Sequence, residues 1–136
     1  MEDVEVRMYE KKDLEGVNKI LGEAFSAKRE DFEGEEFKEI VAVFDQKVVG
    51  YLLLTRVWNP IGKRIVYYVD YVCVDSEYRG HEIGRKLMDK AYEIAKENGA
   101  KYLQLTCSHF RVAAHKLYEK CNYVKRDSDI FRKEIL

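Results

Sequence analysis

The chain has 136 residues, which is enough for one domain with a sizeable core and too few for two complete domains. Its formal net charge is -1 with 36% charged residues of both signs, so no overall field draws it to nucleic acid or to an anionic membrane. The N-terminus lacks the apolar core of a signal peptide and no window approaches the ~18 apolar residues of a membrane span, so we expect a cytoplasmic protein.

The cysteines favour neither a disulfide framework nor a zinc site. Cys73, Cys107 and Cys121 are odd in number and show no Cys-x-x-Cys spacing. We expect three reduced thiols and no metal. A nucleophilic role for Cys73 is a weak alternative, because no base lies near it in sequence.

The first quarter of the chain predicts a strand, a helix and a second short helix. Apolar residues alternate from Val4 to Met8, which indicates a first strand. Asp13 can cap a helix whose apolar residues recur with helical spacing and which ends near Ser26. The charged stretch 27–38 predicts a short amphipathic helix or a lid.

Three antiparallel strands are expected next. Apolar runs at 40–44 and 48–57 flank a turn at Asp45-Gln46 and predict a β-hairpin. The stretch Trp58-Asn59-Pro60-Ile61-Gly62 turns the chain into a third strand over 63–74.

An anion site is predicted where this third strand ends. After Val74 the chain breaks into a turn containing Gly80, and a helix with a regular apolar face follows and ends at Gly99. The amides of such a turn and of a helix start point one way, and the helix dipole adds partial positive charge there. Arg79 and Arg85 bracket the turn, so the pattern favours a bound phosphate.

The rest of the chain predicts a strand over 101–107, a helix over about 112–121, and one or two strands within 123–136. The strand-helix-strand unit from Val72 to Cys107 should be a right-handed parallel crossover. Its helix then starts at the carboxyl end of a strand, the edge of a sheet where ligands bind.

Two motifs in this order resemble those of the GNAT superfamily of N-acetyltransferases. The family's acetyl-CoA motif is Arg or Gln, two residues, Gly, one residue, then Gly or Ala, and the matching stretch is Arg79-Gly80-His81-Glu82-Ile83-Gly84. The second motif is matched by Ala114, Tyr118-Glu119-Lys120 and Asn122-Tyr123. The pair is much more specific than either motif alone.

The chain departs from the family pattern at two glycine positions. Asn122 replaces the Gly that follows the last helix, and asparagine tolerates the left-handed conformation expected there. Glu82 replaces the first Gly of the acetyl-CoA motif and brings a carboxylate near the expected pyrophosphate. If its side chain points to solvent the cost is small, whereas an inward side chain should weaken cofactor binding.

The resemblance implies an α/β (α+β) fold of the GNAT type, with a mixed sheet of six to seven strands, about four helices and a splayed strand pair at the acetyl-CoA site. We expect residues 1–136 to form one such domain. In the family the pantetheine arm lies between the splayed strands and bonds to backbone. The implied cofactor contacts are Val72, Cys73, Val74, Arg79, Gly80, His81, Glu82, Ile83, Gly84, Arg85, Arg111, Ala114 and Tyr118.

The resemblance also implies direct acetyl transfer from acetyl-CoA to a primary amine through a ternary complex. Tyr118 matches the family's general acid, and a phenol with a pKa near ~10 stays protonated at neutral pH. Asp70 matches the place where many members carry a Glu that relays the amine proton through water. The backbone N–H of Cys73 or Val74 would hold the oxyanion. Packing alone for Tyr118 and a solvent-facing strand position for Asp70 are the simpler alternatives.

The acceptor is expected to be a small amine bound near Phe25, Trp58 and Asp70, because the stretch from Ser108 to His115 is more similar to family members that act on small amines. Arg111 stands where the family pattern most often has Asn and could contact a CoA phosphate. A protein or peptide amine, a non-catalytic acyl-CoA-binding or sensing domain, and a nucleotide-binding module remain alternatives. We expect a monomer or homodimer with no nucleic-acid or membrane partner.

Overall fold

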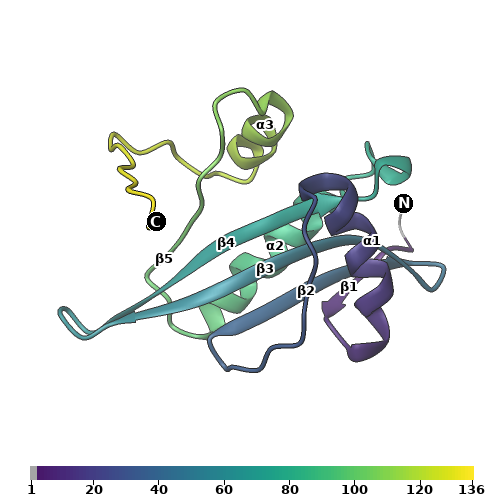
Figure 1. Ribbon diagram of the computed structural model, residues 1–136, viewed down its shortest axis with the longest axis horizontal. Coiled ribbons are helices and arrows are strands. Elements are labelled where there is room, and N and C mark those ends of the chain that lie inside the picture. Colours follow the sequence, from purple (N-terminus) through teal and green to yellow (C-terminus); the bar gives the residue numbers. More distant parts are fainter. Residues whose placement is uncertain (1–2) are drawn as a thin grey trace.

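The structure is a computed structural model that describes residues 3–136, and its centre is one five-stranded sheet with the strands in chain order (Figure 1). The first three neighbouring pairs are antiparallel and the pair β4–β5 is parallel. The strands are β1 Glu5–Met8, β2 Phe37–Phe44, β3 Lys47–Asn59, β4 Arg64–Val74 and β5 Tyr102–Gln104.

Helices cover both faces of this sheet. In Figure 1, α1 (Leu14–Phe25) lies in front of the strands and α2 (Ile83–Glu97) lies behind them, while α3 (Val112–Lys120) lies beyond the β4–β5 side. Short 3-10 helices, η1 (Lys11–Asp13) and η2 (Ser76–Tyr78), precede α1 and α2. No helix among residues 3–136 is both long and apolar enough to cross a membrane.

The core is therefore in two parts. The larger part lies between α2 and the sheet, with Leu52, Leu54, Tyr67 and Leu87 fully buried. The smaller part lies between α1 and the other face and includes Tyr51. Burial of one apolar stripe from each helix follows the helical spacing in the sequence.

Gly50 of β3 allows α2 to lie close to the sheet. A Cβ atom at this position would lie 3.0 Å from Leu87 Cδ1, 3.1 Å from Ile83 Cγ2 and 3.2 Å from Ala42 Cβ. The first turns of α2 thus depend on the absence of a side chain at Gly50. This close approach fixes where α2 begins, and with it the turn that precedes α2.

A β-bulge interrupts the pairing of β3 and β4. Tyr51 lies opposite Cys73 and Leu53 lies opposite Asp70, so a single residue of β3 faces two residues of β4. The first of these two is Tyr71, whose φ of 54° is in the left-handed region. A non-glycine residue held there is uncommon and indicates local strain of about 1–3 kcal/mol.

The bulge reverses the alternation of side chains along β4. Val69 and Val72 both pack on the α2 side of the sheet, whereas Cys73 packs on the α1 side. In a regular strand, residues 69, 71 and 73 would share one face. The extra residue instead leaves Tyr71 exposed and places its ring in edge-to-face contact with Phe25 of α1, 5.3 Å between centroids.

Most element boundaries predicted from the sequence are confirmed, including the turn at Asp45-Gln46 and the end of α2 at Asn98. Asp13 stands at the start of α1, but its carboxylate does not cap the helix. It accepts hydrogen bonds from Arg7 Nη1 at 2.8 Å and from the Glu10 N–H at 2.8 Å instead.

The predicted helix within 27–38 is wrong, because residues 27–34 lack regular structure and Phe37 already belongs to β2. Hydrogen bonds of Arg29 connect this stretch to α1 and β2. Its Nε and Nη2 donate to the Glu39 carboxylate at 2.6 and 2.9 Å, and its backbone N–H donates to Asn18 Oδ1 at 2.7 Å. The Tyr51 hydroxyl donates to the same carboxylate at 2.7 Å. These side-chain bonds take the place of helical ones.

The predicted sheet of six to seven strands with about four helices is also not confirmed, since residues 3–136 form five strands and three α-helices. The expected strands within 123–136 are absent, and β5 is shorter than predicted. Ile130-Phe131 and Ile135-Leu136 come as adjacent apolar pairs, so neither face of a strand there would be continuously apolar. All four side chains are exposed, Phe131 by 94%.

Candidate active site

The turn between β4 and α2 has the backbone geometry expected of an anion site. Gly80 has φ 83°, and Glu82, the residue before α2, has φ 62°. Glu82 therefore adopts a left-handed conformation, which glycine adopts without steric cost, and its side chain is exposed. The free amides at the start of this 15-residue helix remain available to a phosphate.

Asp75 anchors the entry to this turn. Its buried carboxylate accepts a hydrogen bond from the Glu77 N–H at 3.0 Å and lies 3.4 Å from Lys47 Nζ. Burial raises the pKa of Asp75, but the Glu77 hydrogen bond and the Lys47 charge outweigh burial and hold the pKa below its usual value. The carboxylate is thus ionised at neutral pH.

A cavity of about 260 Å³ lies between the turn and the end of α1, and Arg79 and Val74 line it together with Ser76, Glu23 and Ala24. His81 is exposed on the turn, and Arg85 is exposed on α2. Gly84 faces α3, where a Cβ atom would lie 3.1 Å from Leu117 Cδ2. A larger residue at Gly84 would therefore push α3 away from α2.

β4 and β5 pair over three residues only. Their register runs from Val66 opposite Tyr102 to Tyr68 opposite Gln104, and no further pair forms in the described part of the chain. The two strands separate beyond this point, as expected for a splayed pair. A second cavity, of about 140 Å³, occupies the gap and is lined by Phe25, Val69, Asp70, Tyr71, Val72, Leu105, Thr106, Arg111 and Tyr118.

The gap between the strands brings together residues from three elements and from the loop before α3. Asp70 and Tyr71 come from the bulge of β4, Phe25 from the end of α1, and Tyr118 from α3. Arg111 precedes α3, and its guanidinium carbon lies 5.4 Å from the centre of the Phe25 ring. A carboxylate, a phenol and a guanidinium therefore share one small cavity.

Tyr118 is in the state that a proton donor requires. It is partly buried, and burial is the main reason that its pKa is raised, with the nearby Arg111 charge opposing the shift. The phenol is therefore protonated at neutral pH. Burial also raises the pKa of Cys73 to about 12, which makes this thiol a poor nucleophile.

Seven of the predicted site residues line one or other of the two cavities. Phe25, Asp70, Val72, Arg111 and Tyr118 line the cavity between β4 and β5, whereas Val74 and Arg79 line the cavity beside the turn.

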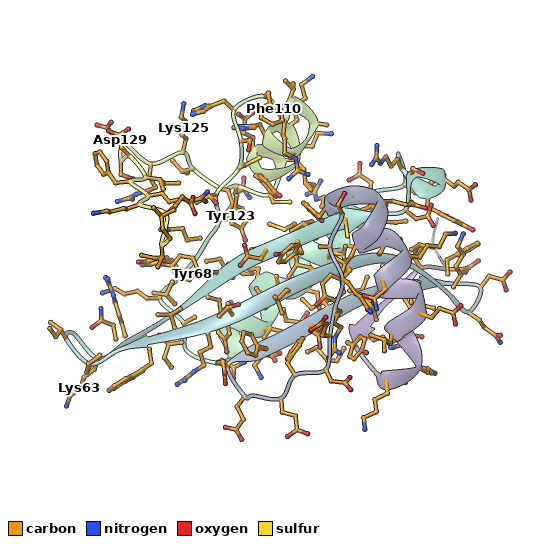
Figure 2. All side chains as sticks on the ribbon, in the orientation of Figure 1. Lys63, Tyr68, Phe110, Tyr123, Lys125 and Asp129 are labelled. Carbon is orange, nitrogen blue, oxygen red and sulfur yellow. The ribbon has the colours of Figure 1, made fainter. Side chains whose placement is uncertain are left out.

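Trp58 lies in neither cavity. It is 52% exposed and pairs with Ile65, near the tip of the β3–β4 hairpin that Lys63 marks at the far end of the sheet (Figure 2). Tyr71, Leu105 and Thr106 were not among the predicted site residues. Only the row of tyrosines around Asp70 hinted at Tyr71.

Comparisons with a family model and with a curated protein both point to acetyltransferases. A model of the acetyltransferase (GNAT) family matches residues 6–123. An uncharacterised N-acetyltransferase of Methanocaldococcus jannaschii is 29% identical over 82 residues, which cover 60% of this chain and 36% of that protein. The chain therefore matches about a third of the length of this curated relative.

Three solved structures share the fold. A Trypanosoma brucei acetyltransferase superposes with a TM-score of 0.79 at 22% identity, covering 97% of this chain and 100% of the other. The ribosomal-protein-alanine N-acetyltransferase of Brucella melitensis superposes with a TM-score of 0.82 at 21% identity, covering 97% of this chain and 99% of the other. An aminoglycoside acetyltransferase from an uncultured soil metagenomic sample superposes with a TM-score of 0.85 at 16% identity, covering 99% of this chain and 97% of the other.

Proposed function

The chain belongs to the GNAT acetyltransferase family, and from this premise we propose that it transfers the acetyl group of acetyl-CoA to a primary amine. The observation that carries the proposal is the cavity between β4 and β5, where Asp70 and Tyr118 line the same small space. The anion-binding turn begins at the end of the same strand, so donor and acceptor sites are joined by β4. We propose one acetyltransferase domain over residues 1–136.

The residues present fit acetyl-CoA as the donor. The edge of β4 from Val72 to Val74 has no strand partner on the β5 side in the described residues, which leaves backbone groups for the pantetheine arm. The amides of the turn from Arg79 to Gly84 suit the pyrophosphate, with Arg79 as a further cation. Acetyl-CoA supplies an activated thioester when it is bound.

Two side chains then handle the protons of the reaction. Asp70 receives a proton from the acceptor ammonium through water, which frees the amine nitrogen to attack the thioester carbonyl carbon. The carbon–sulfur bond breaks as the amide forms, Tyr118 donates its proton to the departing thiolate, and the second proton that the nitrogen loses on becoming an amide restores the phenol. The cavity holds both partners in one ternary complex, so positioning supplies much of the rate.

The acceptor that we propose is a small-molecule amine. The cavity of about 140 Å³ is smaller than the ~300–1,000 Å³ of ordinary ligand pockets, so it admits only the reacting ends of the two substrates. The fold alone does not choose an acceptor, because the related structures include enzymes named for aminoglycosides and for a ribosomal protein. A protein amine is the second candidate.

The test compares two neighbouring tyrosines. The rings of Tyr118 and Tyr123 lie 6.2 Å apart, and the Tyr123 hydroxyl is buried without a hydrogen-bond partner in the described residues. We expect Tyr118→Phe to lower kcat by about 10²-fold or more in a thiol-release assay while acetyl-CoA binding by calorimetry is unchanged. Tyr123→Phe should leave both quantities within about twofold of the parent protein.

Two outcomes would contradict the proposal. A native protein that does not bind acetyl-CoA in the calorimeter lacks the donor site. A protein that binds acetyl-CoA, turns over no amine and is insensitive to Tyr118→Phe is a binding or sensing domain instead. Gly84→Asp serves as the negative control for binding, because its side chain would enter the contact with Leu117 and bring negative charge to the phosphate turn.

A further inference from the structure

Two residues of opposite charge line the cavity between β4 and β5, and neither forms an ion pair within the part of the chain that the structure describes. Among residues 3–136, neither the Asp70 carboxylate nor the Arg111 guanidinium takes part in an ion pair or a side-chain hydrogen bond. Arg29 and Lys47 also contact aromatic rings, but both have carboxylate partners, whereas Arg64, which contacts Tyr102, has no ion pair in the described residues. Arg111 and Asp70 are therefore both available to a ligand.

Helix stability does not explain the position of Arg111. It immediately precedes α3, where the partial positive charge of the helix dipole disfavours a cation. Its positive charge also lies close enough to Cys73 and Tyr118 to oppose the rise in their pKa values. The guanidinium is thus directed toward the reacting centre and away from the favourable end of its own helix.

The phosphates of the donor do not need this cation. The phosphate turn carries Arg79 and Arg85, and the cavity beside the turn contains Arg79 but not Arg111. Arg111 lines the other cavity, with Asp70 and Val69 of β4. This placement differs from the expectation that Arg111 contacts a CoA phosphate.

We infer that the acceptor is an amino acid or a closely similar compound, with a carboxylate one or two carbons from its amine, and that Arg111 binds the carboxylate. This inference rests on the proposed acetyltransferase function. The guanidinium carbon lies 5.4 Å from the centre of the Phe25 ring, and a guanidinium that contacts only a ring keeps its N–H groups free for two parallel hydrogen bonds to a carboxylate. Asp70 would then bind the ammonium group.

The size of the cavity and its charge both support this class of acceptor. A cavity of about 140 Å³ suits an ammonium and a carboxylate held close together. A polyamine would bring additional positive charge toward Arg111 and would be repelled. A simple alkylamine would leave the guanidinium without its partner.

The experiment measures kcat/KM for matched acceptors, each amino acid against the amine that lacks its carboxylate and against its amide, at saturating acetyl-CoA. We expect the parent protein to prefer the amino acid by about tenfold or more. Arg111→Gln should lower kcat/KM for the amino acid by about 10- to 100-fold, mainly through KM, with little effect on the decarboxylated amine. The KM of acetyl-CoA should be unchanged.

Lys116→Gln is the matched control, because it removes an exposed cation from α3, the helix that Arg111 precedes, and Lys116 does not line the cavity. It should leave every constant within about twofold, and circular dichroism of both variants should match that of the parent protein. A short peptide with an acidic second residue tests whether the carboxylate can come from a peptide. Acceptance of that peptide over the free amino acid would overturn the assignment to an amino acid.

Other results would overturn the inference in distinguishable ways. A rise in the KM of acetyl-CoA, equal for both acceptors, would assign Arg111 to the donor. A preference of the parent protein for the decarboxylated amine would exclude a carboxylate-bearing acceptor. Acetyl-CoA binding without turnover of any acceptor would remove the inference but keep the donor site, whereas loss of binding as well would remove the proposed function itself.

Discussion

The two helices that frame the candidate site are packed in very different ways. Six residues of α2 are buried, whereas α3 has no buried residue. α2 begins at the turn that we propose for the donor phosphates, while α3 carries Tyr118 and is preceded by Arg111. The donor side is therefore built on the core, and the acceptor side is built on a short helix with few buried contacts, which we expect to adapt more easily.

The largest expected difference concerns stability. Leu87 of α2 is fully buried, so Leu87→Ala should lower the free energy of unfolding by about 2–5 kcal/mol. Leu117 of α3 is only partly buried, and Leu117→Ala should cost about 1 kcal/mol. Urea denaturation measures both. Equal losses would show that α3 is as firmly packed as α2 and would remove the contrast.

A pair of glycines isolates the packing of α2. Gly50→Ala places a methyl group 3.0 Å from Leu87 Cδ1 and should cost about 1–3 kcal/mol of unfolding free energy. The control Gly22→Ala, in α1, meets no atom within 4 Å and should stabilise the protein by about 0.5–1 kcal/mol. Thermal unfolding distinguishes the two directions, and a neutral Gly50→Ala would mean that α2 can move outward freely.

Acid should weaken the donor side through Asp75. Its folded pKa is lowered, so its contribution to stability is fully present above its unfolded pKa of about 3.9 and is lost as the pH falls through the folded value. Asp75→Asn should therefore be less stable than the parent protein at pH 7, and the difference should shrink below about pH 4. A difference that stays constant from pH 7 to pH 3 would show that the carboxylate's charge is not involved.

The smallest expected effect concerns Glu82. Glu82→Gly removes both a carboxylate near the phosphate turn and a left-handed non-glycine residue, so acetyl-CoA affinity should rise by a few-fold, about 1 kcal/mol. Glu82→Gln removes the charge alone and separates the two causes. Glu97→Gln, at the distant end of α2, should leave calorimetric affinity unchanged. Weaker binding by both Glu82 variants would show that the carboxylate assists the donor site.

Features set by neighbouring residues could be predicted from the sequence. The left-handed residues Gly99 and Asn122 end α2 and α3 as expected, because their conformational preferences are local. The motif around Gly80 likewise located the turn. Tertiary contacts could not be read in this way, and the ion pair of Arg29 with Glu39, which replaces the expected helix in 27–38, joins residues ten positions apart.

The candidate site shows the same division. Asp70, chosen for its position on the strand before the turn, and Tyr118, chosen from the second motif, line one cavity, and their roles remain predictions. Trp58 was placed wrongly relative to this cavity, because β3 runs for 13 residues and carries it toward the hairpin tip. The position of Tyr71 in the cavity depends on the bulge in β4. The apolar pattern of the strand does not predict this bulge, and the two consecutive exposed residues, Asp70 and Tyr71, become evident only in the structure.

The bulge at Tyr71 also sets which changes this segment can accept during evolution. Deletion of a single residue here would turn every later side chain of β4 to the opposite face, so that Cys73 would exchange its environment with Val74. Substitutions change one side chain at a time, but a one-residue deletion would alter the whole approach to the phosphate turn. Relatives should therefore differ in residue type along this strand and seldom in its length, whereas the connection between α1 and β2 can vary in both.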